Sequence, residues 1–216
     1  MKIAVCFSGQ IRSFNLVKDS IKNFLLYDPN VDVFCHTYYK YDNSKFENFY
    51  NPACTVDYGD FGDINLNELI DLYKPISFKF EAPSYEENAK SMFNSIYESN
   101  ELKKQYEEAN DFKYDLVVRC RYDLLFNAHT NYVIDDNIHV INRPGGRGGI
   151  NDWYAYGNSQ NMDIYSSVFA CYKDTENVKE IGPEKLLGEH VQKNNVPVEF
   201  LQNYNFCLQR RDGSKL

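Results

Sequence analysis

The sequence predicts an α/β fold in which a mainly parallel sheet is flanked by helices, as a single domain over residues 1–216. Two observations predict this fold. Short apolar runs rich in β-branched and aromatic residues alternate with segments whose apolar residues recur at helical spacing. The chain has 216 residues, enough for one sizeable core and short for two independent domains.

In the first half of the chain, expected strands alternate with expected helices. The apolar runs predict strands at residues 2–8, 31–39 and 76–80. Helical spacing predicts helices at 16–26, at 64–74 and after the capping-box pattern of Ser84 and Glu87. Residues 57–63 are rich in Gly and Asp and are expected to form a loop.

The second half continues the alternation. Strands are expected at residues 115–126, 137–142 and 153–156, with a strand-like run at 198–209. Helices are expected at 162–172 and 183–193. The glycine-rich segment 145–149 lacks the Lys-Ser/Thr pair of a phosphate-binding P-loop, so it is interpreted as a turn or an acceptor-side loop.

Composition argues against several classes of function. The formal net charge is -8 and the basic residues are dispersed, which disfavours a nucleic-acid partner. The longest apolar runs are only a few residues, so no membrane span is expected. The chain opens directly with strand-like sequence, and its six cysteines include no C-x-x-C pair. Both features favour a cytoplasmic location.

The predicted strand at residues 115–126 carries charge on one face. Successive side chains of a strand face opposite ways, so Arg119, Arg121 and Asp123 share a face while the other face is core. Burying charge is costly, so this placement needs a reason. The charges lie towards the carboxyl end of the strand, where ligands bind in open α/β sheets.

The end of the first strand carries a second group of candidate residues: Ser8, Gly9, Gln10 and Arg12. Glycine allows close backbone approach, and the following helix offers its N-terminal amides to an anion. Guanidinium groups match phosphate oxygens, and a carboxylate can bind a divalent ion that bridges them. The pattern therefore outlines a nucleoside diphosphate site. The alternative is that the strand charges form only structural ion pairs.

Four segments resemble, in order and spacing, a family of small glycosyltransferase-like proteins found in bacterial polysaccharide clusters and in large DNA viruses and phages. They are KIAVCFSGQIRSF (2–14), VDVFCHTYY (31–39), YDLVVRCRYDL (114–124) and NDWYAYGNSQNMD (151–163). The resemblance spans nearly the whole chain. It implies a GT-A type fold, a nucleotide-diphospho-sugar donor, and a glycan or small-molecule acceptor.

The resemblance also implies a metal site, with one departure. GT-A enzymes bind a metal ion and the donor diphosphate through Asp-x-Asp, whereas this chain has Arg121-Tyr122-Asp123. By the resemblance, Asp123 binds Mn²⁺ or Mg²⁺ and Arg121 contacts phosphate or sugar directly. His190 is a candidate second ligand, with a packing residue as the alternative. A single carboxylate holds such ions weakly, which leaves metal dependence open.

Asp152 resembles the acidic position that meets acceptor or sugar hydroxyls in these transferases. In an inverting reaction it would be the general base, and the alternative for Asp152 is an Asx turn or helix cap. The sequence therefore predicts a glycosyltransferase. Its rival is a noncatalytic nucleotide-sugar-binding or scaffold module with a degenerate metal site. The expected donor-binding residues are Ser8, Gly9, Gln10, Arg12, Arg119 and Arg121.

Overall fold

A computed structural model describes most of the chain. The described residues are 1–11, 13–38, 66–81, 88–142, 149–176, 178–210 and 213–216. Four sequence-based expectations fall outside them: Arg12 as a donor-binding residue, the loop at 57–63, the capping box of Ser84 and Glu87, and all but Gly149 of the turn or acceptor-side loop at 145–149.

A seven-stranded, mainly parallel sheet organises the described residues, as the sequence predicted. Its order is β3-β2-β1-β4-β7-β6-β8. Parallel pairing joins β3 to β2, β2 to β1, β1 to β4 and β6 to β8, whereas β7 runs antiparallel to both of its neighbours. The strands are β1 (Ile3–Ser8), β2 (Val31–Tyr38), β3 (Ser77–Glu81), β4 (Leu116–Cys120), β6 (Ile138–Ile141), β7 (Tyr154–Gly157) and β8 (Val198–Leu201).

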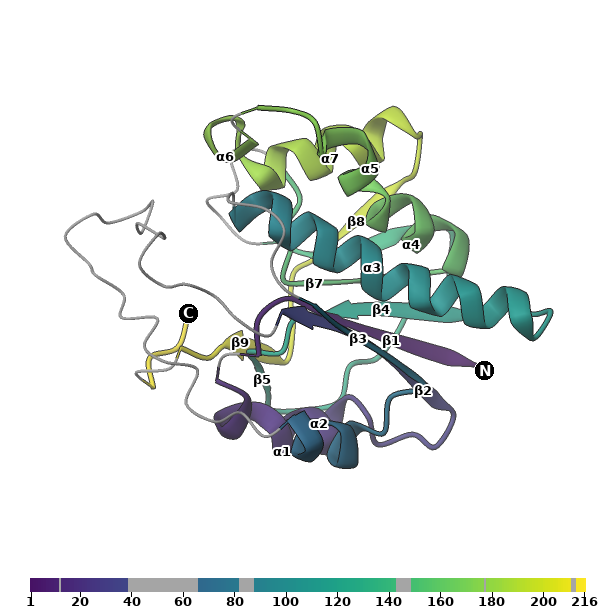
Figure 1. Cartoon of the computed structure of the whole chain (residues 1–216), viewed down its shortest axis with the longest axis vertical. Coiled ribbons are helices and arrows are strands. Elements are labelled where there is room, and N and C mark those ends of the chain that lie inside the picture. Colours follow the sequence, from purple (N-terminus) through teal and green to yellow (C-terminus); the bar gives the residue numbers. More distant parts are fainter. Residues whose placement is uncertain (12, 39–65, 82–87, 143–148, 177, 211–212) are drawn as a thin grey trace.

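Helices cover both faces of the sheet (Figure 1). On one face lie α1 (Phe14–Phe24) and α2 (Leu66–Tyr73). The other face carries α3 (Asn88–Ala109), α4 (Ser159–Ser166), α5 (Val168–Tyr172), α6 (Val178–Ile181) and α7 (Pro183–Lys193). None of the helices in the described ranges is long and apolar enough to cross a membrane.

Strand alternation divides the core into two apolar clusters, one on each face. In β1, Val5 and Phe7 pack towards α1 and α2, while Ala4 and Cys6 pack towards α3. β4 alternates in the same way, with Val118 on the first side and Val117 on the second. Both clusters share one sheet, as expected for a single α/β domain.

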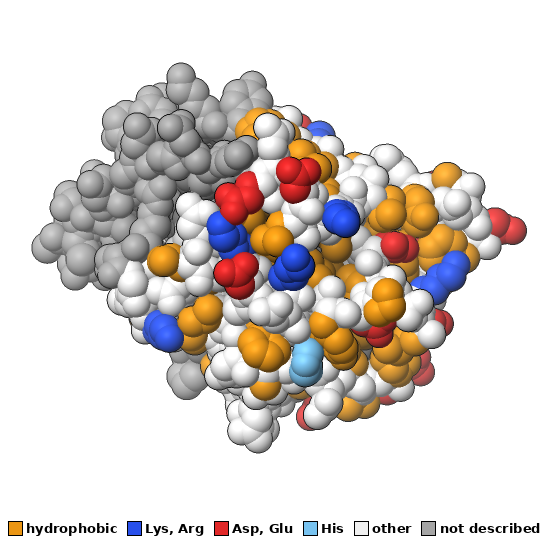
Figure 2. Space-filling view, turned by 90° about the horizontal axis from the view of Figure 1, so that it is seen from below, with side chains coloured by type: hydrophobic (Ala, Val, Ile, Leu, Met, Phe, Trp, Pro, Cys, Tyr) orange, Lys and Arg blue, Asp and Glu red, His pale blue; other side chains and the backbone are white. Residues whose placement is uncertain are grey.

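The outer surface of α1 and α2 carries charges of both signs. Figure 2 shows acidic and basic side chains side by side on this face, among white and orange atoms. Lys18 of α1 and Glu68 of α2 form an ion pair that joins the two helices. Interspersed charge of this kind does not build the continuous basic surface that a nucleic-acid backbone requires.

Three of the strands and helices that the sequence predicted are shortened or divided in the structure. The charged strand ends at Cys120 rather than residue 126, and residues 121–123 turn the chain out of the sheet. Leu124–Phe126 forms β5, which pairs antiparallel with β9 (Phe206–Leu208) in a separate two-stranded sheet. The expected helix at 162–172 is divided at Ser167 into α4 and α5. The run at 198–209 is divided between β8 and β9.

Close backbone contact holds the segment before β7 against α7. The Ile150 N–H donates to the Glu184 carbonyl oxygen at 2.9 Å. A Cβ added at Gly149 would lie 2.0 Å from that oxygen, so only glycine fits without movement of the backbone. This contact fixes the start of the segment that carries Asp152.

Gly149→Ala is therefore expected to lower the free energy of unfolding by about 1–3 kcal/mol, through overpacking against backbone. Gly188→Ala is the matched control, because its Cβ would meet atoms no closer than 3.4 Å, within a helix that favours alanine. We expect this control to unfold at the same or a slightly higher denaturant concentration. Equal destabilisation of the two variants would contradict the close contact at Gly149.

Candidate functional site

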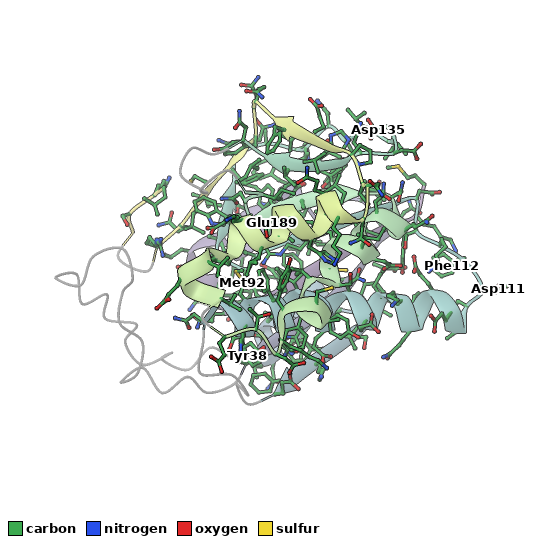
Figure 3. The ribbon with its side chains drawn as sticks, turned by 90° about the horizontal axis from the view of Figure 1, so that it is seen from above. Tyr38, Met92, Asp111, Phe112, Asp135 and Glu189 are labelled. Atoms are coloured by element: carbon green, nitrogen blue, oxygen red, sulfur yellow. The ribbon has the colours of Figure 1, made fainter. Side chains whose placement is uncertain are left out.

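The candidate site lies at the carboxyl ends of β1 and β4, beside the start of α3. The register pairs Phe7 with Cys120, so the residues that follow these two strands lie next to one another. In Figure 3, Tyr38, which ends β2, and Met92, near the start of α3, lie left of the centre of the molecule. Asp111 and Phe112, just beyond α3, lie at its right-hand end (Figure 3).

Arg119 is the most deeply buried cation of this site. Its side chain extends from β4, on the face that α4 covers, and is only 2% exposed. Its Nε and Nη1 have no hydrogen-bond partner among the residues that the structure describes. The Tyr165 hydroxyl of α4 is likewise buried without one, and burial raises the pKa of Tyr165. Buried donors of this kind are costly unless a ligand or water completes them.

Arg121 forms a two-pronged ion pair with Asp123. Its Nε donates to Asp123 Oδ1 at 2.8 Å and its Nη2 donates to Asp123 Oδ2 at 2.7 Å. Asp123 is 1% exposed and Arg121 is 17% exposed, so the pair has one buried member and one at the surface. Burial disfavours the charged form of Arg121, but the charge and hydrogen bonds of Asp123, together with the Asp152 charge, outweigh burial and raise the pKa of Arg121.

Asp152 completes a group of four charges. Its Oδ2 lies 4.0 Å from Arg119 Nη2 and 3.8 Å from Arg121 Nη1, and it has no hydrogen-bond partner in the described part of the chain. The Asx turn at this position is made by the preceding residue, because Asn151 Oδ1 accepts from the Trp153 N–H at 2.9 Å. The Asp152 carboxylate is therefore not needed for that turn.

The expected donor-binding residues Ser8, Gly9 and Gln10, at the end of β1 and just after it, differ in their hydrogen bonding. Ser8 Oγ and Gln10 Oε1 are buried without hydrogen-bond partners within the described ranges. Gly9 has φ 108°, a conformation that favours glycine. Its N–H donates to Ser95 Oγ at 2.7 Å and its carbonyl oxygen accepts from Thr37 Oγ1 at 2.8 Å. The Gly9 amide is thus bonded to α3 and not directed at a phosphate.

Sequence reasoning missed a chain of hydrogen bonds from Ser95 through His36 to Glu81, the His36 relay, which lies next to Gly9. Ser95 Oγ lies 2.8 Å from His36 Nδ1, and His36 Nε2 lies 3.1 Å from Glu81 Oε1. These contacts fit a neutral imidazole that carries its proton on Nε2, with Ser95 donating to Nδ1. Burial lowers the pKa of His36, although Glu81 opposes that shift. A lone histidine in an apolar strand carried no pattern that could have identified the relay.

The described side chains do not fit a divalent metal ion. Both oxygens of Asp123 are bonded to Arg121, and Asp152 faces two guanidinium groups. His190 Nε2 lies 2.8 Å from the Ile164 carbonyl oxygen of α4, which favours the packing role for this histidine. Within the described residues there is no cluster of three or more His, Cys, Asp or Glu side chains that could hold a metal.

A second buried ionic cluster, formed between α3 and α4, satisfies every N–H donor of its lysine. Lys103 of α3 is completely buried and donates to Glu107 at 3.1 Å, Ser159 at 2.7 Å and Asp163 at 2.7 Å. An ammonium group has three N–H donors, so every one is used. The Lys103 cluster therefore leaves no lysine donor for a ligand, whereas Arg119 has two N–H donors without a partner among the described residues.

The comparisons with known proteins place the chain in a family. A family described as a domain of unknown function, DUF7796, matches residues 1–211. The chain belongs to this family. No curated protein matches the DUF7796 chain.

Many solved structures match this DUF7796 member, and one of them aligns over most of both chains. It is the crystal structure of a glycosyltransferase involved in the glycosylation of the major capsid of PBCV-1. The TM-score is 0.46 and the identity 11%, over 93% of this chain and 83% of that chain. At this TM-score the likeness says nothing about activity, so the proposal below rests on the side chains of the site.

The His36 relay predicts a pH dependence of stability. Because the pKa of His36 is lowered in the fold, the unfolded chain binds more protons as the pH falls below about 6.5, the ordinary histidine value. The free energy of unfolding should therefore fall as the pH drops through this range. Carboxylates whose pKa is lowered in the fold, such as Glu81, lose their contribution to stability at lower pH, below their ordinary pKa of 4.5.

His36→Gln is expected to reduce the slope of unfolding free energy against pH. Urea denaturation between about pH 7.5 and 5, the range in which histidine titrates, measures this slope. The pKa of His190 is also lowered by burial, so His190→Gln should remove a separate part of the slope. An unchanged slope in His36→Gln would show that His36 is not held neutral by the fold.

Proposed function

We propose that the protein transfers a sugar from a nucleotide-diphospho-sugar donor to a hydroxyl group of a glycan or other acceptor. The observation that carries this proposal is the pair of unsatisfied Arg119 donors, buried beside Asp152 where β1 and β4 end. Ligands bind at this edge of open α/β sheets. The sequence resemblance to small glycosyltransferase-like proteins, stated above, supports a donor of this class.

Two guanidinium groups suit the diphosphate of such a donor. Their N–H groups are fixed in a planar fork, which matches pairs of phosphate oxygens. Arg119 keeps Nε and Nη1 without a partner in the described structure, and Arg121 stands nearer the surface. In this proposal a phosphate oxygen satisfies Arg119, and Arg121 contacts the same diphosphate from the rim.

The reaction assigns separate tasks to the arginines and to Asp152. The acceptor oxygen bonds to the anomeric carbon as the bond from that carbon to the diphosphate oxygen breaks. The electron pair of the broken bond stays on the diphosphate, whose growing charge the arginines stabilise. In an inverting reaction, Asp152 takes the proton from the acceptor hydroxyl. Its Oδ2 has no hydrogen-bond partner among the described residues and is suited to this task.

A noncatalytic nucleotide-sugar-binding module is the rival proposal. The observation that favours it is the Arg121–Asp123 pair, which occupies the carboxylate expected to hold a metal. Such a module would bind the donor without turnover. The two proposals make the same prediction for binding and opposite predictions for transfer or donor hydrolysis.

Arg119→Met is expected to weaken binding of the matching nucleoside diphosphate by about 10- to 100-fold, the value of charge-assisted hydrogen bonds. The free energy of unfolding should change much less than the binding free energy, because Arg119 Nε and Nη1 lose no hydrogen bond and Arg121 still faces Asp152. Calorimetric titration with UDP, GDP and dTDP, together with urea denaturation, measures both quantities. Equal loss of binding and stability would assign Arg119 a structural role.

Asp152→Asn is expected to leave donor affinity within about threefold while lowering turnover by about 10²- to 10⁴-fold, since the amide cannot accept the acceptor proton. Transfer or donor hydrolysis with the sugar conjugates of the nucleotide that binds provides the measurement. Asp111→Asn is the matched control, because Asp111 lies at the opposite end of the molecule (Figure 3). Its φ of 52° is one that asparagine tolerates. Tight donor binding without any turnover in the unmodified protein would favour the binding module.

A further inference from the structure

We propose that this site works without a divalent metal ion, with the Arg121 guanidinium supplying the positive charge that faces the donor diphosphate. The inference rests on the proposed function, because it concerns how the same site holds the same donor. It replaces the expectation that Mn²⁺ or Mg²⁺ bridges Asp123 and the diphosphate.

The first argument is the occupation of Asp123. A metal-binding carboxylate must offer at least one oxygen to the ion, but Nε and Nη2 of Arg121 bond one oxygen each, at 2.8 and 2.7 Å. The backbone on either side is fixed as well. The Arg121 N–H donates to the Trp153 carbonyl oxygen at 3.3 Å, and the Asp123 carbonyl oxygen accepts from the Gln209 N–H at 2.9 Å. The backbone therefore fixes both members of the Arg121–Asp123 ion pair.

The second argument is the cost of exchanging the guanidinium for a metal. Asp123 is 1% exposed, so its charge depends on the two hydrogen bonds from Arg121, and an incoming ion would have to displace both. The ion would also stand close to Arg119 and Arg121, both within 4.0 Å of Asp152. Repulsion from these cations opposes binding of a dication at this place. His190, the other expected ligand, is bonded to α4.

The third argument is that Arg121 remains able to bind phosphate while paired. A guanidinium has five N–H donors, and Asp123 engages one on Nε and one on Nη2. At 17% exposed, Arg121 is the more accessible of the two arginines. An arginine side chain stays charged at ordinary pH, and Asp123 raises the pKa of Arg121 further. Asp123 then acts as a positioning residue that orients Arg121.

The test begins with the unmodified protein and the probes UDP, GDP and dTDP, titrated calorimetrically in EDTA and again in Mn²⁺. We expect one nucleoside diphosphate to bind with affinities that agree within about twofold in the two conditions. Arg121→Ala should weaken this EDTA-resistant binding by about 10- to 100-fold. Arg121→Lys should recover only part of the loss, because an ammonium group cannot replace the planar fork.

A gain-of-function variant sharpens the test. Arg121→Asp supplies a second carboxylate two residues before Asp123 and removes the cation that occupies it. We expect this variant to bind Mn²⁺, seen directly by electron paramagnetic resonance, and to bind the nucleotide only when Mn²⁺ is present. Lys22→Asp is the control, because it makes the same charge change at an exposed residue of α1. If Arg121→Asp does not fold, the comparison of EDTA with Mn²⁺ in the unmodified protein still decides.

The outcomes separate this inference from the proposed function. Equal binding in EDTA and Mn²⁺ supports both. Binding that appears only with Mn²⁺ overturns the metal-free site and leaves the transferase proposal intact. Absence of binding in both conditions overturns both proposals. Binding of Mn²⁺ alone to the unmodified protein, lost in Asp123→Ala, would show that Arg121 yields its place to the ion.

Discussion

The arrangement of four charges where β4 leaves the sheet is the constraint on which the rest of the site depends. Arg119 and Arg121 lie within 4.0 Å of Asp152 because β7, which begins just after Asp152, runs antiparallel next to β4. Charges are expensive to bury unless they are paired. The turn at residues 121–123 provides the pairing, since it brings the Asp123 carboxylate against the Arg121 fork.

Surrounding elements fix this arrangement from two sides. The small sheet of β5 and β9 holds the chain just after Asp123. On the other side, Gly149 and Ile150 pin the segment before Asp152 to the backbone of α7. The charged groups therefore sit on backbone that is bonded to rigid elements. Such support is what a preorganised anion site requires, because donors that are already oriented need little rearrangement when charge develops.

The two buried ionic clusters differ in how many of their polar atoms have hydrogen-bond partners. Around Lys103 every N–H donor has a partner, and Glu107 also accepts from the Tyr114 N–H and the Ser159 hydroxyl. Around Arg119, in contrast, two donors and one Asp152 oxygen have no hydrogen-bond partner in the described structure. Buried polar groups without partners weaken a fold, which is why the proposed donor is placed at the arginine cluster.

Sequence reasoning predicted the fold well, and failed where local pattern carries no information. The helix expected at residues 183–193 is found with those bounds, because Pro183 and the apolar spacing mark it. The strand ending at Cys120 was extended to residue 126, since Tyr122, Leu124 and Phe126 stay in the same core after the chain has left the sheet. Alternation alone cannot detect such an exit.

The site residues divide in the same way. The sequence predicted that Arg119, Arg121 and Asp123 share one face near the carboxyl end of a strand, whereas the structure pairs Arg121 with Asp123 through the turn after Cys120 and sets Arg119 beside Asp152. The His36 relay was missed, because it depends on Ser95, which is 59 positions away in the sequence. The direction of the Gly9 amide depends on the same serine. Contacts of this range follow from packing of α3 on the sheet and leave no local signature.

The measurement that tests the central claim most directly follows the arginine Nε–Hε signals by ¹⁵N nuclear magnetic resonance while the matching nucleoside diphosphate is added in EDTA. Assignment uses Arg119→Lys and Arg121→Lys. The account predicts that the Arg119 signal shifts and that its hydrogen exchange slows, because a phosphate oxygen takes up a donor that had none. A nucleotide that binds without changing the Arg119 or the Arg121 signal would contradict the account.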